Sequence, residues 1–273
     1  MTHTDSASDP NPPAPARPVV LCFAGHDPSG GAGLQADIET LVAHGCHCIP
    51  VVTALTDQDS RNLYALRAVD GEWIRTQTQR LVEDFDIRAV KIGLVGSTAG
   101  MEAIRQLLDA PALRNRPLVL DPVLAAGGGG QFAGADYPDR LRELLVPRAL
   151  ITTPNQQELH ALVPAAAEAD AVAALHAQGC AHVVVTGVAD PHDTHLTNRL
   201  YSAGGVAPQG FRTQRLPGHY RGTGCSLAAA VTAGLAHRQS VPDAVRHATQ
   251  WTAQAIARAQ RLGHGQAYLT RAP

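Results

Sequence analysis

Short apolar runs alternate with amphipathic stretches along most of this chain of 273 residues. An uninterrupted apolar run between turn residues is typical of a strand that is covered on both faces of a sheet. Such runs predict buried strands at residues 19–24, 48–55, 89–95, 117–120, 150–152 and 181–186. A further run at residues 63–69 is interrupted by Arg67 and predicts an edge strand.

The stretches between these runs carry apolar residues at helical spacing. In the first of them, Leu34, Ile38 and Leu41 recur at helical intervals, and Gly45 provides a stop. The same reasoning predicts further helices at residues 72–83, 99–108, 139–145, 156–162, 168–178, 225–236 and 241–261. Residues 194–216 are instead typical of antiparallel strands at one edge of a sheet.

Alternation of strands and helices predicts an α/β fold class. Parallel strands joined by right-handed crossovers place helices on both faces of a central sheet. No break in composition suggests a second domain, so we expect residues 18–273 to form a single domain. Residues 1–17 are polar and rich in proline, and we expect them to be a disordered leader.

Composition and charge narrow the range of partners. The chain is 45% hydrophobic and 17% charged, which indicates a globular fold rather than disorder. Its formal net charge of -2 gives no electrostatic reason to expect nucleic acid or an anionic membrane. Aromatic residues, at 4%, offer no stacking surface for bases. We therefore expect small-molecule partners, with no nucleic acid and no membrane.

Five cysteines form an odd number without the spacing of a disulfide framework. This usage favours free thiols in a reducing compartment. The leader lacks the apolar segment of a secretory signal, and no apolar run approaches the length that crosses a membrane. We therefore expect a cytoplasmic protein.

A turn with two glycines runs directly into an alanine-rich helix at residues 221–230. Gly222 and Gly224 allow the backbone to bend tightly and to bring N–H groups close to a ligand. The first turn of a helix has unpaired N–H groups and favours negative charge. Cys225 lies in that turn, where the pKa of a thiol is lowered and a thiolate forms near neutral pH. The pattern predicts an anion site with a potential base; a plain loop with a buried cysteine as filler is the alternative.

Ligands of parallel sheets bind beyond the carboxyl ends of the strands, so the residues that follow the predicted strands should converge on one rim. Among them, Asp121 and Glu158 are candidates for holding a hydrated Mg²⁺, which takes few carboxylates together with phosphate oxygens. The alternative for Glu158 is a helix-start carboxylate that serves the helix dipole. Four glycines at residues 127–130 suit either a flap over phosphates or an idle surface loop.

The glycine-rich loop at residues 25–33 follows the first predicted strand. Its spacing departs from the dinucleotide-binding fingerprint, so a glycine-lined wall for a small flat ligand is the better interpretation. Asp37 is expected to point toward the same rim, or to serve only as a carboxylate near a helix start. Gln58 has both a donor and an acceptor and suits a ring nitrogen with its amine, unless it is an ordinary loop glutamine.

Two other patterns carry less weight. Residues 44–48 contain two histidines and two cysteines, but they span a helix end and a strand start, so core packing is expected rather than a metal site. His219 and Cys225 suggest a Cys–His hydrolase. That interpretation provides no positioned third group and leaves Asp121 and Glu158 unused.

Six motifs occur in order over nearly everything after Pro18. They are AGHDPSGGAGLQAD at residues 24–37, TALTDQ at 53–58, VKIGL at 90–94, LDPV at 120–123, TPNQQE at 153–158 and GTGCS at 222–226. Together they resemble the bacterial hydroxymethylpyrimidine/phosphomethylpyrimidine kinases of thiamin synthesis, within the ribokinase-like superfamily. The resemblance implies a three-layer α/β/α sandwich with a mostly parallel sheet, ATP and Mg²⁺ as co-substrate and cofactor, and a homodimer.

The resemblance also assigns site residues. Cys225 matches the position of the catalytic base, and Gly222, Thr223 and Gly224 match the anion hole. The positions that match the substrate-binding residues of the family are Gly25, Ala32, Asp37, Thr56, Gln58, Leu94 and Val123.

Metal and nucleotide positions follow from the same resemblance, with one departure. Asp121 and Glu158 match positions near the metal and the phosphates. The family often has a lysine after the late strand, where this chain has Thr186 before Gly187. The only lysine of the chain comes too early to replace it, so Mg²⁺, backbone N–H groups and Arg221 are expected to meet the phosphate charge.

The implied reaction is ATP-dependent phosphorylation of 4-amino-5-hydroxymethyl-2-methylpyrimidine and then of its monophosphate. A pyridoxal kinase of the same superfamily is one alternative, since it uses a similarly flat hydroxymethyl heterocycle. A catalytically weak pyrimidine-binding regulatory protein, suggested by Thr186, is another.

Overall fold

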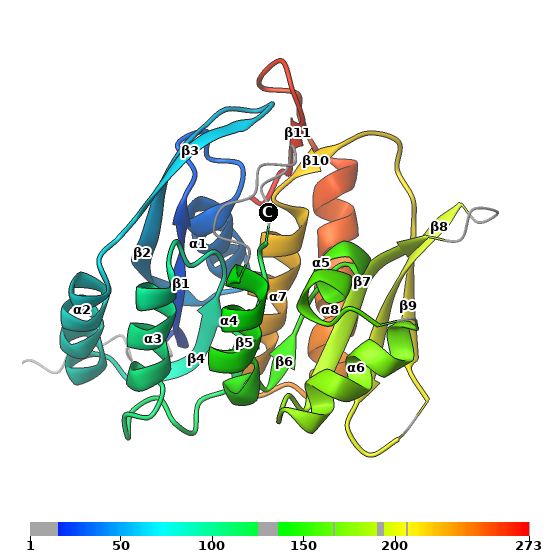
Figure 1. Cartoon of the computed structure of the whole chain (residues 1–273). Helices are drawn as coiled ribbons and strands as arrows, with labels where there is room; N and C mark the ends of the chain where they lie inside the picture. Colours follow the sequence, from blue (N-terminus) through cyan, green and yellow to red (C-terminus); the bar gives the residue numbers. More distant parts are fainter. Residues whose placement is uncertain (1–15, 125–135, 166, 190–193, 206, 273) are drawn as a thin grey trace, which may run out of the picture.

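The computed structural model describes residues 16–124, 136–165, 167–189, 194–205 and 207–272. A nine-stranded sheet crosses the centre of the molecule in the order β3-β2-β1-β4-β5-β6-β7-β8-β9 (Figure 1). Neighbouring strands from β2 to β7 in this order are parallel, and antiparallel strands complete both edges. The strands are β1 (Val19–His26), β2 (His47–Gln58), β3 (Leu63–Ala68), β4 (Ile87–Ile92), β5 (Leu118–Leu120), β6 (Ile151–Thr152), β7 (His182–Ala189), β8 (His195–Ser202) and β9 (Gln209–Gln214).

Helices cover both faces of this sheet and complete three layers (Figure 1). One face carries five helices whose apolar residues share a core cluster with the strands. They are α2 (Gly71–Asp84), α3 (Thr98–Leu107), α4 (Tyr137–Leu144), α5 (Gln156–Leu162) and α6 (Glu168–Ala177), with the 3₁₀ helix η1 (Val146–Arg148) after α4. The other face carries α1 (Gly33–Ala43), α7 (Thr223–Ala236) and α8 (Val241–Ala257). The predicted α/β/α sandwich is confirmed.

Helix α7 is buried along almost its whole length. Every residue from Ser226 to Ala236 is buried, because α7 packs against the sheet, α1 and α8 together. Alanine and glycine dominate this helix, and small side chains allow it to approach the sheet closely. A helix that is apolar on all sides belongs in the interior of a protein. Its N-terminal end is therefore held firmly at one end of the sheet.

The strand order creates a crevice at one place in the sheet. The chain runs outward from β1 to β2 and β3, and then returns to the other side of β1 with β4. Strands β1 and β4 are neighbours in the sheet, but the loop that follows β1 leads to one face of the sheet and the loop that follows β4 leads to the other. Ligands of open parallel sheets bind in the crevice between two such loops. The motifs at residues 24–37 and 90–94 lie at this point.

A small second sheet closes this end of the molecule and was not predicted. Strand β10 (Tyr220–Arg221) pairs in parallel with β11 (Ala267–Tyr268) next to the start of α7 (Figure 1). Each strand has two residues, too few to leave a periodic pattern in the sequence. A separate antiparallel bridge explains why α8 ends at Ala257 and not at residue 261: Gln260 exchanges backbone hydrogen bonds with Tyr268.

The histidines and cysteines at residues 44–48 take part in packing. Cys46 and Cys48 are buried in the core cluster beneath α1. The ring of His44 meets Trp251 edge-on at 4.7 Å, and that of His47 stacks on Phe85 at 6.1 Å.

Several predictions fall on residues outside the described ranges. The four glycines at residues 127–130 and nearly all of the leader at residues 1–17 belong to this group. A disordered leader and a single domain over residues 18–273 stay predictions. No helix in the described ranges is long and apolar enough to cross a membrane.

Candidate functional site

The first turn of α7 is held at the crevice end of the sheet. Its N-cap, Gly222, has a left-handed φ of 77°, and no side chain caps the helix. A Cβ at Gly222 would collide with the carbonyl oxygen of Gly31, so glycine is required for this close approach. The helix thus begins at Thr223, Gly224 and Cys225 with N–H groups that no side-chain cap satisfies, as the predicted anion hole requires.

A buried arginine near the end of the chain fastens this turn to the glycine-rich loop. Arg271 Nη2 donates to the carbonyl oxygen of Gly31 at 2.6 Å, and Arg271 Nε donates to Ser226 Oγ at 2.8 Å. Its Nη1 lies 3.1 Å from Glu39 Oε2. Sequence analysis missed Arg271, because no local pattern marks a contact with a residue 240 positions away.

A cluster of ionisable side chains lies beneath the first turn of α7. Lys91 on β4 is fully buried, and its Nζ lies 2.7 Å from Asp37 Oδ1 and 3.8 Å from Asp121 Oδ2. The thiol of Cys225 and the carboxylate of Asp121 influence each other's pKa. Burial alone would lower the pKa of Lys91, but the neighbouring negative charge, that of Asp37 first, outweighs burial and raises this pKa. Lys91 is therefore the positive centre of the cluster.

The structure places Asp37 elsewhere than predicted. Its side chain is 0% exposed, because it points from α1 into the protein and not toward the open rim. Burial raises the pKa of Asp37 to about 6, although the charge of Lys91 opposes this change. Asp37 is thus ionised at neutral pH and pairs with Lys91 beneath the first turn of α7.

Cys225 lies in the predicted place, but its pKa differs from the prediction. The residue is half-buried in the first turn of α7. Burial and then the negative charge of Asp121 raise the pKa of the thiol to about 12, although Lys91 acts in the opposite direction. The prediction of a lowered pKa is wrong for this chain, because desolvation and a carboxylate outweigh the helix N-terminus. The thiol therefore keeps its proton at neutral pH.

The two predicted metal ligands influence each other across the ends of β5 and α5. Burial and the charge of Asp121 raise the pKa of Glu158 to about 8. Glu158 also forms a capping box: its Oε2 accepts from the N–H of Asn155, and Asn155 Oδ1 accepts from the N–H of Glu158, each at 2.9 Å. The helix-start role considered for Glu158 is therefore present as well.

These carboxylates fit a small hard cation. Asp121 Oδ2 is buried without a hydrogen-bond partner, and the pairing of Lys91 with Asp37 leaves no positive charge over for Asp121. Oxygen ligands and a shortage of positive charge suit Mg²⁺, which keeps several water or phosphate ligands. Within the described ranges, no group of three or more His, Cys, Asp or Glu side chains is placed to hold a metal ion. A cation here would thus take two protein carboxylates at most.

The raised pKa of Glu158 has a measurable effect on stability. The folded chain holds this proton up to about pH 8, whereas the unfolded chain releases it near the ordinary glutamate pKa of 4.5. Between these values the folded state binds more protons, so the free energy of unfolding falls as the pH rises. The quantity to compare is the midpoint temperature of unfolding of the wild type minus that of Glu158→Gln, in a metal-free buffer. We expect this difference to decrease as the pH rises from about 5 to about 8.5. Thermal unfolding followed by circular dichroism measures it, and a difference that does not change with pH would contradict the raised pKa.

Arg221 is turned into the protein and not toward phosphates. It is 3% exposed. Its Nε donates to Asp27 Oδ2 at 2.9 Å, and its Nη2 donates to Gln58 Oε1 at 2.6 Å. Asp27 Oδ2 also accepts from the N–H of Ala32 at 3.0 Å. Because its guanidinium is already paired, Arg221 does not have the geometry of the predicted nucleotide ligand.

The remaining predicted substrate positions surround the glycine-rich loop. Leu94 packs against Gly25 so closely that a Cβ there would meet Leu94 Cδ2 at 2.9 Å. Thr56 Oγ1 donates to the carbonyl oxygen of His26 at 2.8 Å, which holds the end of β2 against the end of β1. Val123 is half-buried beyond the end of β5. The loop wall expected from the sequence therefore exists, and its contacts with a ligand stay a prediction.

Thr186 and Gly187 lie at an irregularity in the pairing of β7 with β8. The N–H of Thr186 donates to the carbonyl oxygen of Pro154 at 2.9 Å, which ties β7 to the start of α5. Gly187 has a φ of 64°, and its N–H donates to Asn198 Oδ1 at 2.9 Å. These contacts bring both residues to the same end of the sheet as Glu158, and their contact with a nucleotide stays a prediction.

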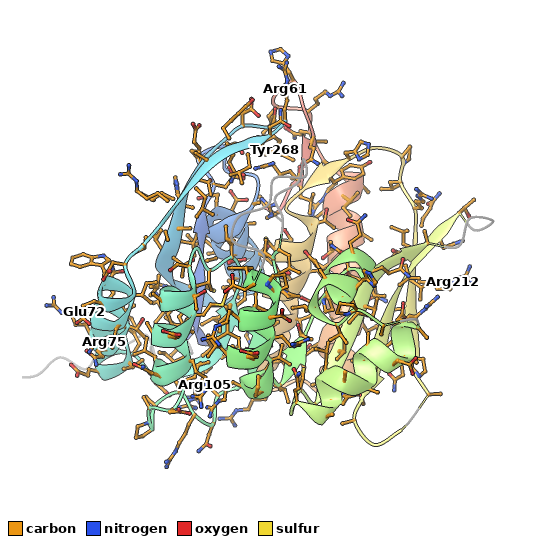
Figure 2. The ribbon with its side chains drawn as sticks, viewed as in Figure 1. Arg61, Glu72, Arg75, Arg105, Arg212 and Tyr268 are labelled. Atoms are coloured by element: carbon orange, nitrogen blue, oxygen red, sulfur yellow. The ribbon has the colours of Figure 1, made fainter. Side chains whose placement is uncertain are left out.

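A cavity of about 470 Å³ opens beside the β10–β11 sheet. Figure 2 shows Arg61, one of its lining residues, at the same end of the molecule as Tyr268. The residues that line it are Ser60, Arg61, Pro217, Gly218, His219, Tyr220, Arg261, Gly265, Gln266 and Ala267. This lining contains none of the residues that the family resemblance assigns to the base, the anion hole, the substrate, the metal or the nucleotide.

A model of the phosphomethylpyrimidine kinase family matches residues 27–270. The chain belongs to this family. Hydroxymethylpyrimidine/phosphomethylpyrimidine kinase from Streptomyces coelicolor is 35% identical over 94% of this chain and 94% of its own length. Membership in the phosphomethylpyrimidine kinase family confirms the resemblance that the six motifs carry.

Solved structures show the same fold. The ADP complex of Bacillus subtilis pyridoxal kinase matches with a TM-score of 0.84 and 26% identity, covering 94% of this chain and 98% of that one. Phosphomethylpyrimidine kinase from Clostridium difficile matches with a TM-score of 0.74 and 27% identity, covering 88% of this chain and 100% of that one. The fold of this phosphomethylpyrimidine kinase family member is thus shared by kinases of two flat heterocycles.

Proposed function

We propose that this chain uses ATP and Mg²⁺ to phosphorylate 4-amino-5-hydroxymethyl-2-methylpyrimidine and then its monophosphate. The observation that carries the proposal is the start of α7, where N–H groups without a side-chain cap adjoin Cys225 and Asp121. Membership in the phosphomethylpyrimidine kinase family and the name of the Streptomyces coelicolor relative support this choice of substrate. The ADP complex of Bacillus subtilis pyridoxal kinase supports the use of ATP.

Phosphoryl transfer depends mainly on alignment and on stabilising the charge of the transferring group. The hydroxymethyl oxygen would lie beside Cys225, and the N–H groups of the turn from Gly222 would hold the phosphoryl oxygens. As the new O–P bond forms, the bond between phosphorus and the ADP oxygen breaks, and ADP keeps the electron pair. The hydroxyl proton passes to the sulfur of Cys225, which must be in its thiolate form.

Asp121 and Glu158 are the residues that would hold Mg²⁺ beside this turn. A bound Mg²⁺ would neutralise phosphate charge and the carboxylate charge that raises the pKa of the Cys225 thiol. Lys91 and Asp37 hold Asp121 in place from below. The charge of Asp121 therefore helps burial to keep the Cys225 thiol protonated while no Mg²⁺ is bound.

The proposal is tested by measuring ADP formation with hydroxymethylpyrimidine, its monophosphate and pyridoxal side by side. We expect ADP release with both pyrimidines and weaker release with pyridoxal. Release with neither pyrimidine would overturn the proposal. A clear preference for pyridoxal would favour a pyridoxal kinase, the alternative that the Bacillus subtilis structure supports. Thermal stabilisation by pyrimidine without ADP release would favour the regulatory protein.

We also propose that the chain forms a homodimer and lies in the cytoplasm. Analytical sedimentation would test the dimer, and cell fractionation would test the location.

A further inference from the structure

Arg271 reaches the first turn of α7 from the far end of the chain, and its guanidinium is almost completely enclosed. The β10–β11 pairing brings it there, because β10 directly precedes Gly222 and β11 ends three positions before Arg271. The side chain of Arg271 is 1% exposed. Its Nε and Nη2 donate into the protein, to Ser226 Oγ and to the carbonyl oxygen of Gly31. Its Nη1 donates to Glu39, whose side chain is 40% exposed.

The bond from Arg271 determines where the hydrogen of the Ser226 hydroxyl lies. A guanidinium can only donate, so Ser226 Oγ must accept from Arg271 and keep its own hydrogen for another partner. That partner is the carbonyl oxygen of Gly222, to which Ser226 Oγ donates at 2.8 Å. The same oxygen accepts from the N–H of Ser226 at 2.9 Å. Two donors thus hold the Gly222 carbonyl, and Arg271 orients one of them.

The orientation of the Gly222 carbonyl sets the direction of an N–H group in the anion turn. A peptide unit is planar and trans, so the N–H of Thr223 points opposite to the Gly222 carbonyl. That carbonyl points into α7 toward Ser226, and the N–H of Thr223 therefore points out of the helix end. Gly222 has no Cβ that would restrict its backbone, so these hydrogen bonds maintain the orientation.

Arg271 holds the glycine-rich loop in a similar way. The carbonyl oxygen of Gly31 accepts from Arg271 at 2.6 Å, and the other end of the same peptide unit, the N–H of Ala32, donates to Asp27 Oδ2 at 3.0 Å. The Gly31 oxygen lies directly against Gly222, where a Cβ would overlap it. One guanidinium therefore bonds the loop and the helix turn together, with its fork divided between them.

We propose that Arg271 is a positioning residue for phosphoryl transfer, which acts through Ser226 and Gly222 on the N–H of Thr223. Without the guanidinium, the Ser226 hydroxyl can rotate away, and the peptide unit between Gly222 and Thr223 loses one of its restraints. N–H groups stabilise a transferring group best when they are aimed at it in advance. The inference rests on the proposed function, since it takes the phosphoryl oxygens to lie against this turn.

Steady-state ADP formation by two single variants and their double variant tests this inference. For Arg271→Met we expect kcat to fall roughly 10–100-fold and KM for the pyrimidine to change less than about threefold, because the loss falls on the transferring group. Ser226→Ala should act in the same direction but more weakly, because the N–H of Ser226 still holds the Gly222 carbonyl. The double variant should lose less than the product of the two single losses, since both changes break the same series of bonds.

Arg271→Lys separates direction from charge. An ammonium keeps the positive charge, but it is a point donor that cannot hold Ser226 and Gly31 in one planar fork. We therefore expect Arg271→Lys to recover little of the kcat that Arg271→Met loses. A purely electrostatic role would instead be restored by lysine.

Arg148→Met is the matched control. Arg148 likewise donates to a backbone carbonyl, that of Leu108, and to a carboxylate, that of Asp109, each at 2.7 Å. It lies in η1, on the face of the sheet opposite to α7. Arg148→Met should therefore keep the kcat of the wild type. Thermal unfolding shows whether each variant is folded at the assay temperature, and if Arg271→Met is not, Arg271→Lys and Ser226→Ala carry the test.

The outcomes separate this inference from the proposed function. An active wild type with an unchanged kcat in Arg271→Met would overturn the inference alone. Full turnover in Arg271→Lys, or a double variant that loses the full product of the single losses, would also overturn it, because Arg271 would then act by charge or apart from Ser226. A wild type that releases no ADP with either pyrimidine would overturn the proposed function and the inference together.

Discussion

Replacing Cys225 by alanine is expected to lower kcat at least 100-fold, within the roughly 10²–10⁴-fold range of acid–base catalysis, and to change KM for the pyrimidine little. The reason is that alanine leaves the N–H groups of the α7 turn in place while removing the proposed base. Steady-state ADP formation measures kcat, and calorimetric titration with the pyrimidine confirms that binding survives. A variant with near-normal turnover would contradict the role of Cys225 as the base.

The pH profile gives this prediction a second readout. Because the pKa of the Cys225 thiol is raised to about 12, the thiolate is a minor species at neutral pH, and its fraction grows as the pH rises. We expect kcat/KM of the wild type to increase from pH 6 to pH 9 and the residual activity of Cys225→Ala to lack this increase. Cys46→Ala is the matched control, since it removes a buried thiol at α1 that contacts His237 and not the site. Its profile should follow the wild type.

Most of the fold could be predicted from local patterns, for identifiable reasons. Strand β1 and the first half of β7 are buried on both faces, and they appear in the sequence as continuous apolar runs. The predicted strand at residues 89–95 ends earlier, at Ile92. Leu94 and Val95 are buried like strand residues, but they leave the sheet to form the wall of the crevice. An apolar pattern reports burial, and burial does not distinguish a strand from a buried loop.

The site was predictable in position and less so in orientation. The residues that follow the strands do gather at one end of the sheet, because the carboxyl ends of parallel strands lie together. Asp37 and Arg221 were placed correctly along the chain, yet both side chains turn inward and pair with Lys91 and Asp27. These partners lie 54 and 194 positions away, and no local pattern contains such a distance.

The same limit explains the error in the pKa of Cys225. A cysteine at a helix N-terminus is a local feature, and by itself it lowers the pKa. The groups that reverse the shift, Asp121 at the end of β5 and the surrounding buried atoms, reach Cys225 only through the fold. Sequence analysis assigned Lys91 no role in the site, because it comes too early in the chain for the expected phosphate ligand. The fold nevertheless places it at the centre of the buried charges.

Lys91→Met is expected to destabilise the chain strongly while leaving its surface unchanged. Lys91 is fully buried, and its Nζ lies 2.7 Å from Asp37 Oδ1. Removing one member of a buried ion pair leaves the other charge without compensation, which costs about 3–5 kcal/mol of the free energy of unfolding. In a chain of this size that loss corresponds to an unfolding midpoint lower by roughly 10 °C. Differential scanning calorimetry measures the change.

Two matched variants decide whether charge pairing is the cause. Lys91→Met/Asp37→Leu removes both charges, so we expect it to regain at least half of the stability lost in Lys91→Met, since an apolar pair of similar volume is tolerated in place of a buried ion pair. Arg88 lies on the same strand, but its side chain is 39% exposed, so Arg88→Met should change the unfolding midpoint little.

Because Lys91 is the only lysine, an amine-specific reagent followed by mass spectrometry reports its burial directly. A double variant no more stable than Lys91→Met, or rapid labelling of Lys91 in the folded protein, would contradict a buried ion pair beneath the first turn of α7.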